Sequence, residues 1–343
     1  MASRPLLTAL LKDVSRSFYL TLRVLPGTIR PQLSLAYLLA RATDTVADTA
    51  LIPLERRLET LRRMRECIRG SAARLPDFGE FARRQANAAE AELLTRFPEA
   101  LRVLEGARMQ DSRLIRDVLA VVVSGQELDL ERFAQAGSQH VVALGSDMEL
   151  DDYTYRVAGC VGEFWTRLCF GHIFGADRHL NEPLLLSQSV RFGKGLQLVN
   201  ILRDLPADLR QGRCYVPLDR LNGLRLVPGD LLSASAEPRF RRLYEEYLAG
   251  ALAHLAAGWE YTNALPRSHL RIRLACAWPV LIGVKTLARL RSVGILEANR
   301  PARVSRQEVY GIVIRTVFLH PWPSAWRRLF DTSGRSASQL VCE

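Results

Sequence analysis

The stretch GLQLVNILRDLPADLRQGRCYVP, residues 195–217, carries the pattern that decides the fold. Its apolar residues recur at spacings of three and four, which predicts a helix over Ser189–Leu205. Asn200, Asp204 and Asp208 follow one another at intervals of four, so a helix would place their oxygens on one face. Apolar residues fill much of the remaining surface, which predicts a central helix or one that lines an apolar cavity.

Six further segments show the same helical periodicity: Leu33–Ala47, Leu54–Ile68, Leu114–Phe133, Tyr153–Phe174, Arg241–Leu265 and Leu270–Leu290. Alternating, β-branched runs are nearly absent. We therefore predict an all-α chain of about ten helices. No linker rich in Gly, Ser or Pro divides the 343 residues, which predicts one domain over 1–343 with a C-terminal tail at about 317–343.

The net charge of +11 suits an anionic partner. The arginines are scattered and are not interleaved with aromatic residues, which argues against nucleic acid and favours a phosphorylated ligand or a lipid headgroup. The six cysteines lack CxxC pairing and have no histidine at metal-binding spacing, which predicts reduced, buried thiols in a cytoplasmic protein. No apolar run is long enough to predict a membrane span.

The segment Val317–Phe330 mixes aromatic side chains with Arg327 and Arg328. Such a mixture is typical of segments that lie on a membrane surface. Two alternatives follow for this segment: peripheral contact with the inner face of a membrane, or packing on the core. Pro321 and Pro323 predict an interruption of any helix there.

A second acidic pair lies in RATDTVAD, residues 41–48, where Asp44 and Asp48 are four residues apart and Arg41 lies one turn earlier. Like charges so placed need cations, and oxygen ligands favour Mg²⁺, which often bridges carboxylates to phosphates. Asp204 and Asp208 repeat this geometry. Two such helices facing each other would hold Mg²⁺ at the entrance of an apolar tunnel formed by the same helices. Such an entrance suits the ionisation of an allylic diphosphate.

Two other patterns are predicted to be structural. Asp147 and Asp151 share the spacing of the acidic pairs but lack apolar neighbours, and Asp151 or Asp152 is expected to cap a helix. Gly193-Lys194-Gly195 is expected to form a turn that opens a helix.

Five segments in this order resemble the squalene/phytoene synthase family: SRSF (15–18), YLLARATDTVAD (37–48), GQELDL (125–130), YTYRVAGCVG (153–162) and residues 195–217. The likeness extends from Ser15 to about Tyr310. It implies an isoprenoid-synthase helical bundle around a central apolar cavity and Mg²⁺ at both acidic pairs. It also implies head-to-head coupling of prenyl diphosphates by way of a cyclopropyl diphosphate intermediate.

The resemblance also implies roles for individual residues. The metal ligands would be Asp44, Asp48, Asn200, Asp204 and Asp208. The catalytic residues would be Tyr37, Arg41, Tyr155, Gln197 and Arg203. The substrate-binding residues would be Ser15, Arg16, Ser17, Phe18, Gln126, Asn200, Arg210, Arg213 and Tyr215, and the arginines among all these suit diphosphate because a guanidinium gives planar, bidentate contacts.

Within the family the C-terminal third looks like squalene synthases, through CAWP (276–279), KTLA (285–288) and RVSR (303–306). This likeness implies that two farnesyl diphosphates give presqualene diphosphate, which NADPH reduces to squalene. Arg303 and Arg306 would contact the NADPH phosphates. A downstream enzyme that uses squalene would then be a partner.

Other products stay open, namely phytoene, dehydrosqualene and hydroxysqualene, as does a non-catalytic relative that acts in binding or assembly. Arg156 stands where animal squalene synthases carry a tyrosine, so Tyr37, Tyr153 or Tyr155 would have to handle the proton. The C-terminal anchor of the eukaryotic enzymes is not found in this sequence, which suggests a bacterial form.

Overall fold

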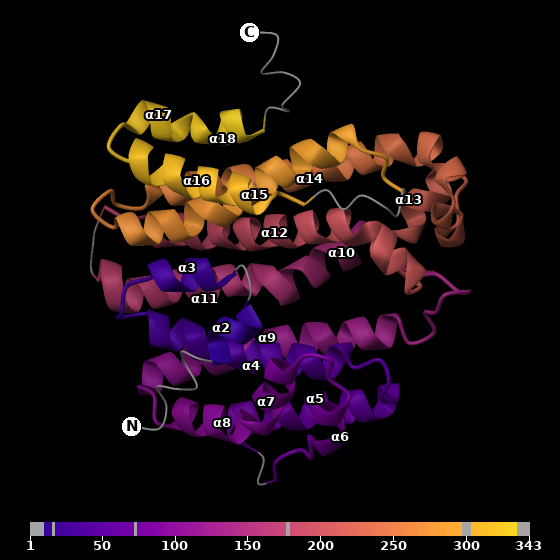
Figure 1. The fold of residues 1–343 in the computed structure, drawn as a ribbon, viewed down its shortest axis with the longest axis horizontal. Helices are drawn as coiled ribbons and strands as arrows, with labels where there is room; N and C mark the ends of the chain where they lie inside the picture. Colours follow the sequence, from indigo (N-terminus) through magenta and orange to yellow (C-terminus); the bar gives the residue numbers. More distant parts are fainter. Residues whose placement is uncertain (1–9, 16–17, 72–73, 176–178, 297–302, 335–343) are drawn as a thin grey trace. The chain divides into compact units, whose positions relative to one another are not determined.

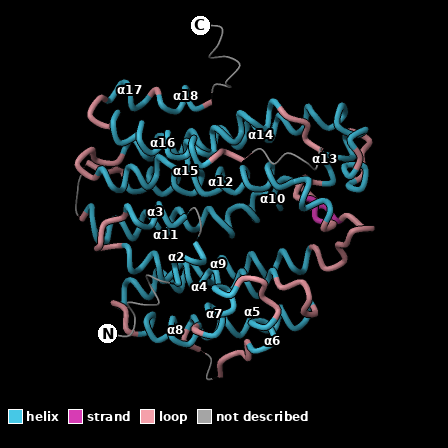
Figure 2. Tube along the Cα trace, viewed as in Figure 1, coloured by secondary structure: helices cyan, strands magenta, loops and turns pink. Residues whose placement is uncertain are grey.

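The protein is described by a computed structural model, which covers residues 10–15, 18–71, 74–175, 179–296 and 303–334 (Figure 1). Across this part of the chain the regular structure is almost entirely helical, which confirms the predicted all-α class. The two-residue strands β1 (Val142–Ala143) and β2 (Arg213–Cys214) pair in parallel (Figure 2).

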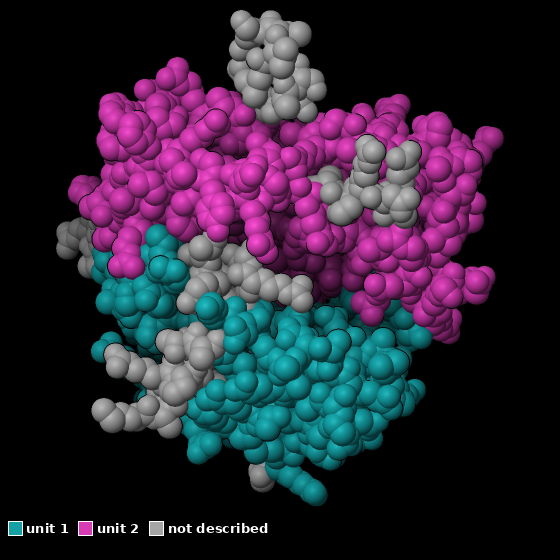
Figure 3. Space-filling view, in the orientation of Figure 1, with its two compact units in different colours: residues 1–134, 164–177 teal, residues 135–163, 178–343 magenta. Residues whose placement is uncertain are grey.

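The chain divides into two compact units (Figure 3). The first consists of residues 1–134 and 164–177, and the second of residues 135–163 and 178–343. One of the boundaries, between Glu163 and Phe164, falls within helix α11 (Cys160–Cys169). The single domain expected from the sequence stays a prediction.

In the first unit, α4 (Arg30–Asp48) is the central helix, because it packs against α5, α7, α8 and α9. Leu38, Leu39, Ala42 and Val46 on α4 are fully buried. The other elements of this unit are α2 (Leu11–Ser15), α3 (Phe18–Val24), α5 (Leu54–Arg69), α6 (Gly79–Arg83), α7 (Ala88–Thr95), α8 (Phe97–Glu105), α9 (Met109–Arg132) and the π-helix η3 (Phe170–Phe174).

In the second unit, α12 (Glu182–Arg210) packs along α14 and α15 and against the π-helix η2. The remaining elements are α10 (Asp147–Thr154), η2 (Tyr155–Gly159), α13 (Leu218–Gly223), the 3-10 helices η4 (Pro228–Leu232) and η5 (Ala234–Ala236), α14 (Glu237–Ala264), α15 (Leu270–Ser292), α16 (Arg306–Leu319), α17 (Pro323–Arg327) and α18 (Leu329–Ser333).

Helix α12 is longer than its apolar pattern predicts. It begins at Glu182, where Asn181 caps it by accepting a hydrogen bond from the Leu184 amide at 3.0 Å. Pro183 lies in the first turn, where its missing amide costs nothing. At the other end the helix continues through Pro206 to Arg210.

The expectation that Gly193-Lys194-Gly195 forms a turn is wrong, because the three residues lie in the middle of α12. A Cβ on Gly193 would lie 2.2 Å from the carbonyl oxygen of Ala158, and one on Gly162 would lie 2.0 Å from that of Ser189. Glycine at both positions therefore lets α12 and the segment after Tyr155 approach backbone to backbone.

The C-terminal segment is partly packed and partly exposed. Trp326 is 1% exposed and Leu329 is buried, whereas Phe318 and Trp322 are more than half exposed. Helix α16 ends at Leu319 and α17 begins at Pro323, as the two prolines predict. Within the described residues, no helix combines the length and the apolar character needed to cross a bilayer.

Five of the cysteines lie in the described part of the chain, and all five are buried and free. Reduced, buried thiols were predicted for them. Cys342 lies outside the described residues.

Candidate active site

Helix α4 presents the first acidic pair in the first unit. Arg41 donates hydrogen bonds to Asp44, one turn further along the helix, and to Oε1 of Glu90 on α7 at 2.7 Å. Asp48, one turn beyond Asp44, is exposed. The sequence therefore predicted the positions of Arg41, Asp44 and Asp48 on this helix, but not Glu90 as a partner.

The surroundings of the Asp44 carboxyl disfavour its ionised form. Burial by the surrounding protein and the charge of Asp48 raise its pKa to about 7, against the opposing effect of Arg41. Even so, 42% of the side-chain surface stays open to solvent. A carboxylate in this situation gains from a cation that can reach it.

Tyr37 and Gln126 are the other predicted site residues with described side chains in this unit. The Tyr37 hydroxyl donates to the carbonyl oxygen of Val14 at 3.3 Å. The Oε1 atom of Gln126 is buried and has no hydrogen-bond partner in the described part of the chain.

The predicted substrate residues near the N-terminus fall largely outside the description. Ser15 ends α2 and Phe18 begins α3, but their side chains are not described. Arg16 and Ser17 lie outside the described residues.

Helix α12 presents the second acidic pair in the second unit. Asn200 is exposed and Asp204 and Asp208 are half-buried, whereas Ile201, Leu202 and Leu205 of the same turns are buried. The predicted oxygen ligands therefore share one accessible face of the helix. The buried residues of the same turns face the core.

Arg203 is fixed beside this pair. Its Nε atom lies 2.9 Å from Oδ1 of Asp204, and a terminal nitrogen lies 2.5 Å from Oδ2. The hydrogen bonds from Arg203 to Asp204 raise the pKa of the guanidinium, so it stays charged. Such a two-pronged donor also matches phosphate oxygens.

The other predicted residues of the second unit take different positions. Gln197 is half-buried on α12 and Arg210 is exposed at its last turn. Arg213 is half-buried in β2. Tyr215 is buried, and its ring stacks on that of Tyr153 with centroids 4.8 Å apart.

Tyr155 begins the π-helix η2, a form of helix that recurs at functional sites. Its hydroxyl makes a long hydrogen bond of 3.5 Å to Oε2 of Glu163, and burial followed by the charge of Glu163 raises the pKa of the phenol. Nζ of Lys194 lies 5.8 Å from the centre of the Tyr155 ring and 2.6 Å from a carboxylate oxygen of Asp151.

Arg156 binds back onto its own helix, with Nε 2.9 Å from both carboxylate oxygens of Asp152. The structural role predicted for Asp147 and Asp151 agrees with their contacts, since Asp147 accepts from Tyr247 at 2.6 Å and pairs with Arg220. The predicted helix cap was wrong. Ser146 caps α10, and Asp151 lies inside it.

Arg303 and Arg306, the predicted NADPH residues, are both exposed at the start of α16. Beside them Glu308 is 3.1 Å from Lys285 and 2.6 Å from Arg289. The carboxylate of Glu308 is therefore shared between two cations of α15.

A model of the squalene/phytoene synthase family matches residues 11–308. The chain belongs to this family. Its members are prenyltransferase-type isoprenoid synthases, and the chain is therefore an enzyme of this kind.

Three relatives of the chain bear different names. A bifunctional lycopene cyclase/phytoene synthase of Colletotrichum graminicola is 32% identical over 264 residues, covering 75% of this chain and 42% of that protein. A presqualene diphosphate synthase of Zymomonas mobilis is 28% identical over 256 residues, covering 75% and 74%. A squalene synthase of Schizosaccharomyces pombe is 25% identical over 319 residues, covering 90% and 64%.

The same fold occurs in solved structures of the family. The complex of TcSQS with the ligand E5700 superposes with a TM-score of 0.73 at 19% identity, over 96% of this chain and 98% of that chain. At that identity the likeness shows the fold, which is the predicted isoprenoid-synthase bundle.

Sequence reasoning missed the partners of the site residues. Glu90 and Glu163 bind Arg41 and Tyr155, and Lys194 was dismissed with its flanking glycines. Glu163 follows the VAGCVG run by one residue, so its position was a usable signal. Glu90 carries no local signal, because it is 49 residues from Arg41.

Proposed function

We propose that the chain couples two farnesyl diphosphates head to head, in a reaction that needs Mg²⁺, and reduces the resulting presqualene diphosphate to squalene with NADPH. One observation supports this proposal above others. In each unit one central helix presents two carboxylates four residues apart with an arginine that is bound to the first of them.

The donor set fits Mg²⁺. Asp44 and Asp48 are oxygen ligands whose mutual repulsion a divalent cation would relieve, and Asn200, Asp204 and Asp208 offer three more oxygen-bearing groups on one face. No cluster of three or more His, Cys, Asp or Glu side chains suited to a metal occurs in the described residues. Each pair would therefore share its ions with the substrate diphosphate, where Mg²⁺ supplies charge neutralisation for the leaving group.

Arg41 and Arg203 have a second task, each beside its own acidic pair. Each guanidinium now binds a carboxylate that we assign to the metal. When the carboxylate turns to a cation, the guanidinium is free to hold oxygens of the departing diphosphate. The arginines thus stabilise the charge that develops on the leaving group.

A proton must leave carbon when the cyclopropane ring of the intermediate closes. Arg156 has no phenol, the Tyr37 hydroxyl donates to a backbone oxygen, and the buried Tyr153 hydroxyl donates to that of Tyr215 at 3.4 Å. Tyr155 is the better group, because its hydroxyl faces the carboxylate of Glu163 and can pass a proton to it.

Arg303 and Arg306 fit a phosphate ester of NADPH, since both are exposed and their carboxylate neighbour Glu308 already binds Lys285 and Arg289. The cofactor would supply the hydride for the second step. A squalene-using enzyme as partner stays a prediction.

A second candidate function is release of presqualene diphosphate without reduction. The Zymomonas mobilis relative, which covers three quarters of the chain, bears that name. The two functions share the first coupling step and differ only in whether NADPH acts.

The test is incubation of the purified protein with farnesyl diphosphate and Mg²⁺, with and without NADPH, followed by product analysis. Squalene that forms only with NADPH would support the first function, and presqualene diphosphate under both conditions would support the second. A C40 product from geranylgeranyl diphosphate, with farnesyl diphosphate inert, would refute both.

A further inference from the structure

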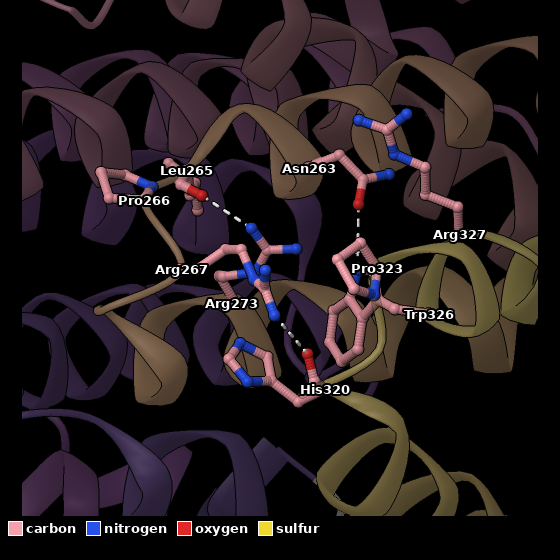
Figure 4. A pocket seen from close by; sticks show the side chains of 9 residues that line it. All are labelled: Asn263, Leu265, Pro266, Arg267, Arg273, His320, Pro323, Trp326 and Arg327. Carbon is pink, nitrogen blue, oxygen red and sulfur yellow. Dashed lines mark hydrogen bonds between the residues drawn. The ribbon is translucent and has the colours of Figure 1, made fainter.

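A separate cavity of about 220 Å³ lies at the C-terminal end of the second unit (Figure 4). The ends of α14 and α15, the loop between them and the segment from His320 to Arg327 form its walls. Arg267, Arg273 and Arg327 line it, and none of the described lining residues is acidic. The predicted diphosphate residues are elsewhere, so this cavity needs its own explanation.

Arg273 is the unusual residue of this cavity, because it is a buried cation without an acidic partner. Its residue surface is only 5% exposed. One terminal nitrogen donates to the Leu265 carbonyl at 2.7 Å, and the guanidinium lies 5.1 Å from the centre of the Trp326 ring. Its Nε atom is buried with no hydrogen-bond partner in the described chain.

The surroundings make this charge costly. Burial, followed by the nearby charges of Arg267 and Arg327, lowers the pKa of Arg273 to about 10. The group still carries its proton at neutral pH. A buried, unpaired charge is rare in proteins, and an anion would supply what it lacks.

Other polar side chains line the same cavity. Nε2 of His320 is buried and has no partner in the described residues. Arg267 donates to the carbonyl oxygens of His320 and Pro321, at 3.4 Å and 2.8 Å, and its charge remains unneutralised by these contacts. Arg327 adds a third guanidinium at the rim, where it is exposed.

We propose that this cavity binds a phosphate group, and that the phosphate belongs to the headgroup of an anionic phospholipid. A buried guanidinium, two exposed ones and an unpaired imidazole nitrogen suit phosphate oxygens, which accept several hydrogen bonds at once. The volume is below the roughly 300–1,000 Å³ of sites that enclose drug-sized ligands. It therefore accommodates a headgroup and leaves the rest of the ligand outside.

The neighbouring surface indicates a lipid as the source. Tyr310, Ile314 and Phe318 lie four residues apart on α16 and are 56%, 68% and 69% exposed. This apolar stripe continues to Trp322, 53% exposed, whose ring centre is 5.8 Å from that of Phe318. The stripe thus ends at the turn that forms the cavity rim.

The charge of this region agrees with an acidic membrane surface. Residues 303–334 contain five arginines and two acidic residues. An exposed apolar stripe flanked by cations is the pattern of elements that lie in the membrane interface. A phosphate cavity beside the stripe would add recognition of the headgroup to nonspecific attraction.

The first experiment measures binding of the full chain to phosphatidylcholine vesicles with and without phosphatidate. Removing two charges from the cavity with R267Q/R327Q should weaken binding to the phosphatidate vesicles about thirtyfold. The matched control R239Q/R242Q removes two exposed arginines from α14, roughly 30 Å away along the helix, and should weaken it far less. Equal losses in both double variants would overturn the proposal.

The second experiment uses inorganic phosphate to separate the cavity from the stripe. Phosphate should raise the thermal unfolding temperature relative to chloride at equal ionic strength, and R273K, which keeps the charge but loses Nε, should abolish the rise. If R273K does not fold, R267Q/R327Q replaces it, because both arginines are exposed and their loss should not prevent folding. This variant should also abolish the rise in unfolding temperature. The stripe variant F318S/W322S should lose vesicle binding and keep the phosphate effect.

The two experiments together test the cavity and the lipid source separately. A phosphate effect without vesicle binding would support the cavity and overturn the lipid as source. No phosphate effect and no dependence of vesicle binding on the cavity arginines would overturn the proposal entirely. Neither result depends on which prenyl product the enzyme makes.

Discussion

Arg203 binds both carboxylate oxygens of Asp204, the residue that follows it, with its Nε and one terminal nitrogen 2.9 Å and 2.5 Å from them. Neighbouring residues on a helix do not normally face each other. Here the long guanidinium folds back along α12 onto the acidic face. In the proposed reaction this contact holds the guanidinium ready beside the metal ligands until diphosphate arrives.

The two-pronged contact predicts that charge alone will not replace Arg203. We expect R203K to lower kcat/KM about tenfold and R203Q about a hundredfold, because lysine keeps the charge but loses the planar fork. The control is R191K on the same helix, where Arg191 only donates to the Ala253 carbonyl. Steady-state assays of diphosphate release measure these differences. Equal rates for R203K and wild type would show that Arg203 does not contribute to the site.

Asp44 can be tested by stability as well as by activity. Its raised pKa means that ionisation above the unfolded value of 3.8 opposes folding, so this cost grows from about pH 4 to about pH 7. Without metal and near neutral pH, the unfolding temperature of D44N should therefore equal or exceed that of the wild type. Added Mg²⁺ should raise the unfolding temperature of the wild type more than that of D44N.

In the assay, D44N should release diphosphate at least about a hundredfold more slowly, since a metal ligand is lost. The matched control is D147N, because Asp147 and Asp151 have the same spacing but bind Tyr247, Arg220 and Lys194 instead. Near-wild-type release by D44N would contradict the metal assignment.

The sequence predicted those parts of the fold that depend on local pattern. The periodic segments correspond to α4, α5, α9, α14 and α15 within a few residues, because one apolar stripe per helix reports burial directly. The short helices α6, α7 and α8 were missed, since five to nine residues show too little periodicity. The glycines of α12 were misread, because only the tertiary contacts of Gly193 with Ala158 and of Gly195 with His254 show why they are needed.

Some residues of the site could also be predicted from local sequence, and others could not. Asp44, Asp48, Asp204 and Asp208 could be found because a spacing of four on an apolar helix is visible in sequence. Glu90, the second hydrogen-bond partner of Arg41, could not be found in this way, since it comes from a different helix. Arg273 gave a weak signal as a cation within the apolar run of α15, but its lack of an acidic partner becomes visible only in the folded chain.

Glu308 provides a prediction about pH. Burial acts to raise its pKa, but hydrogen bonds from Ser305 and Lys285 outweigh burial and lower the pKa to about 2. Because this value lies below the unfolded 4.5, the stabilisation is complete above about pH 4.5 and is lost as the pH falls toward 2.

We therefore expect E308Q to lose about 1 to 3 kcal/mol of unfolding free energy near neutral pH. The difference from wild type should shrink below about pH 4.5, as urea titrations at several pH values would show. As a control, E246Q breaks an ion pair with Arg220 that is nearly half exposed, and should change little. A pH-independent loss in E308Q would indicate lost packing and not lost charge.

Gly162 tests the close approach that positions Tyr155 and Glu163. A methyl group there would meet the carbonyl oxygen of Ser189 at 2.0 Å and its carbon at 2.5 Å, so the two backbones would have to separate. We expect G162A to lower the unfolding free energy by about 3 kcal/mol through overpacking. It should also slow the coupling step, because the segment that carries Tyr155 would shift.

The same methyl group has room at Gly250 on α14, where no atom lies within 4 Å of the added Cβ. Alanine is the better helix former, so G250A should gain about 0.5 to 1 kcal/mol. Urea unfolding of both variants separates the two effects, since helix propensity alone would stabilise both. A G162A protein as stable as G250A would show that the contact between position 162 of α11 and Ser189 of α12 does not require glycine.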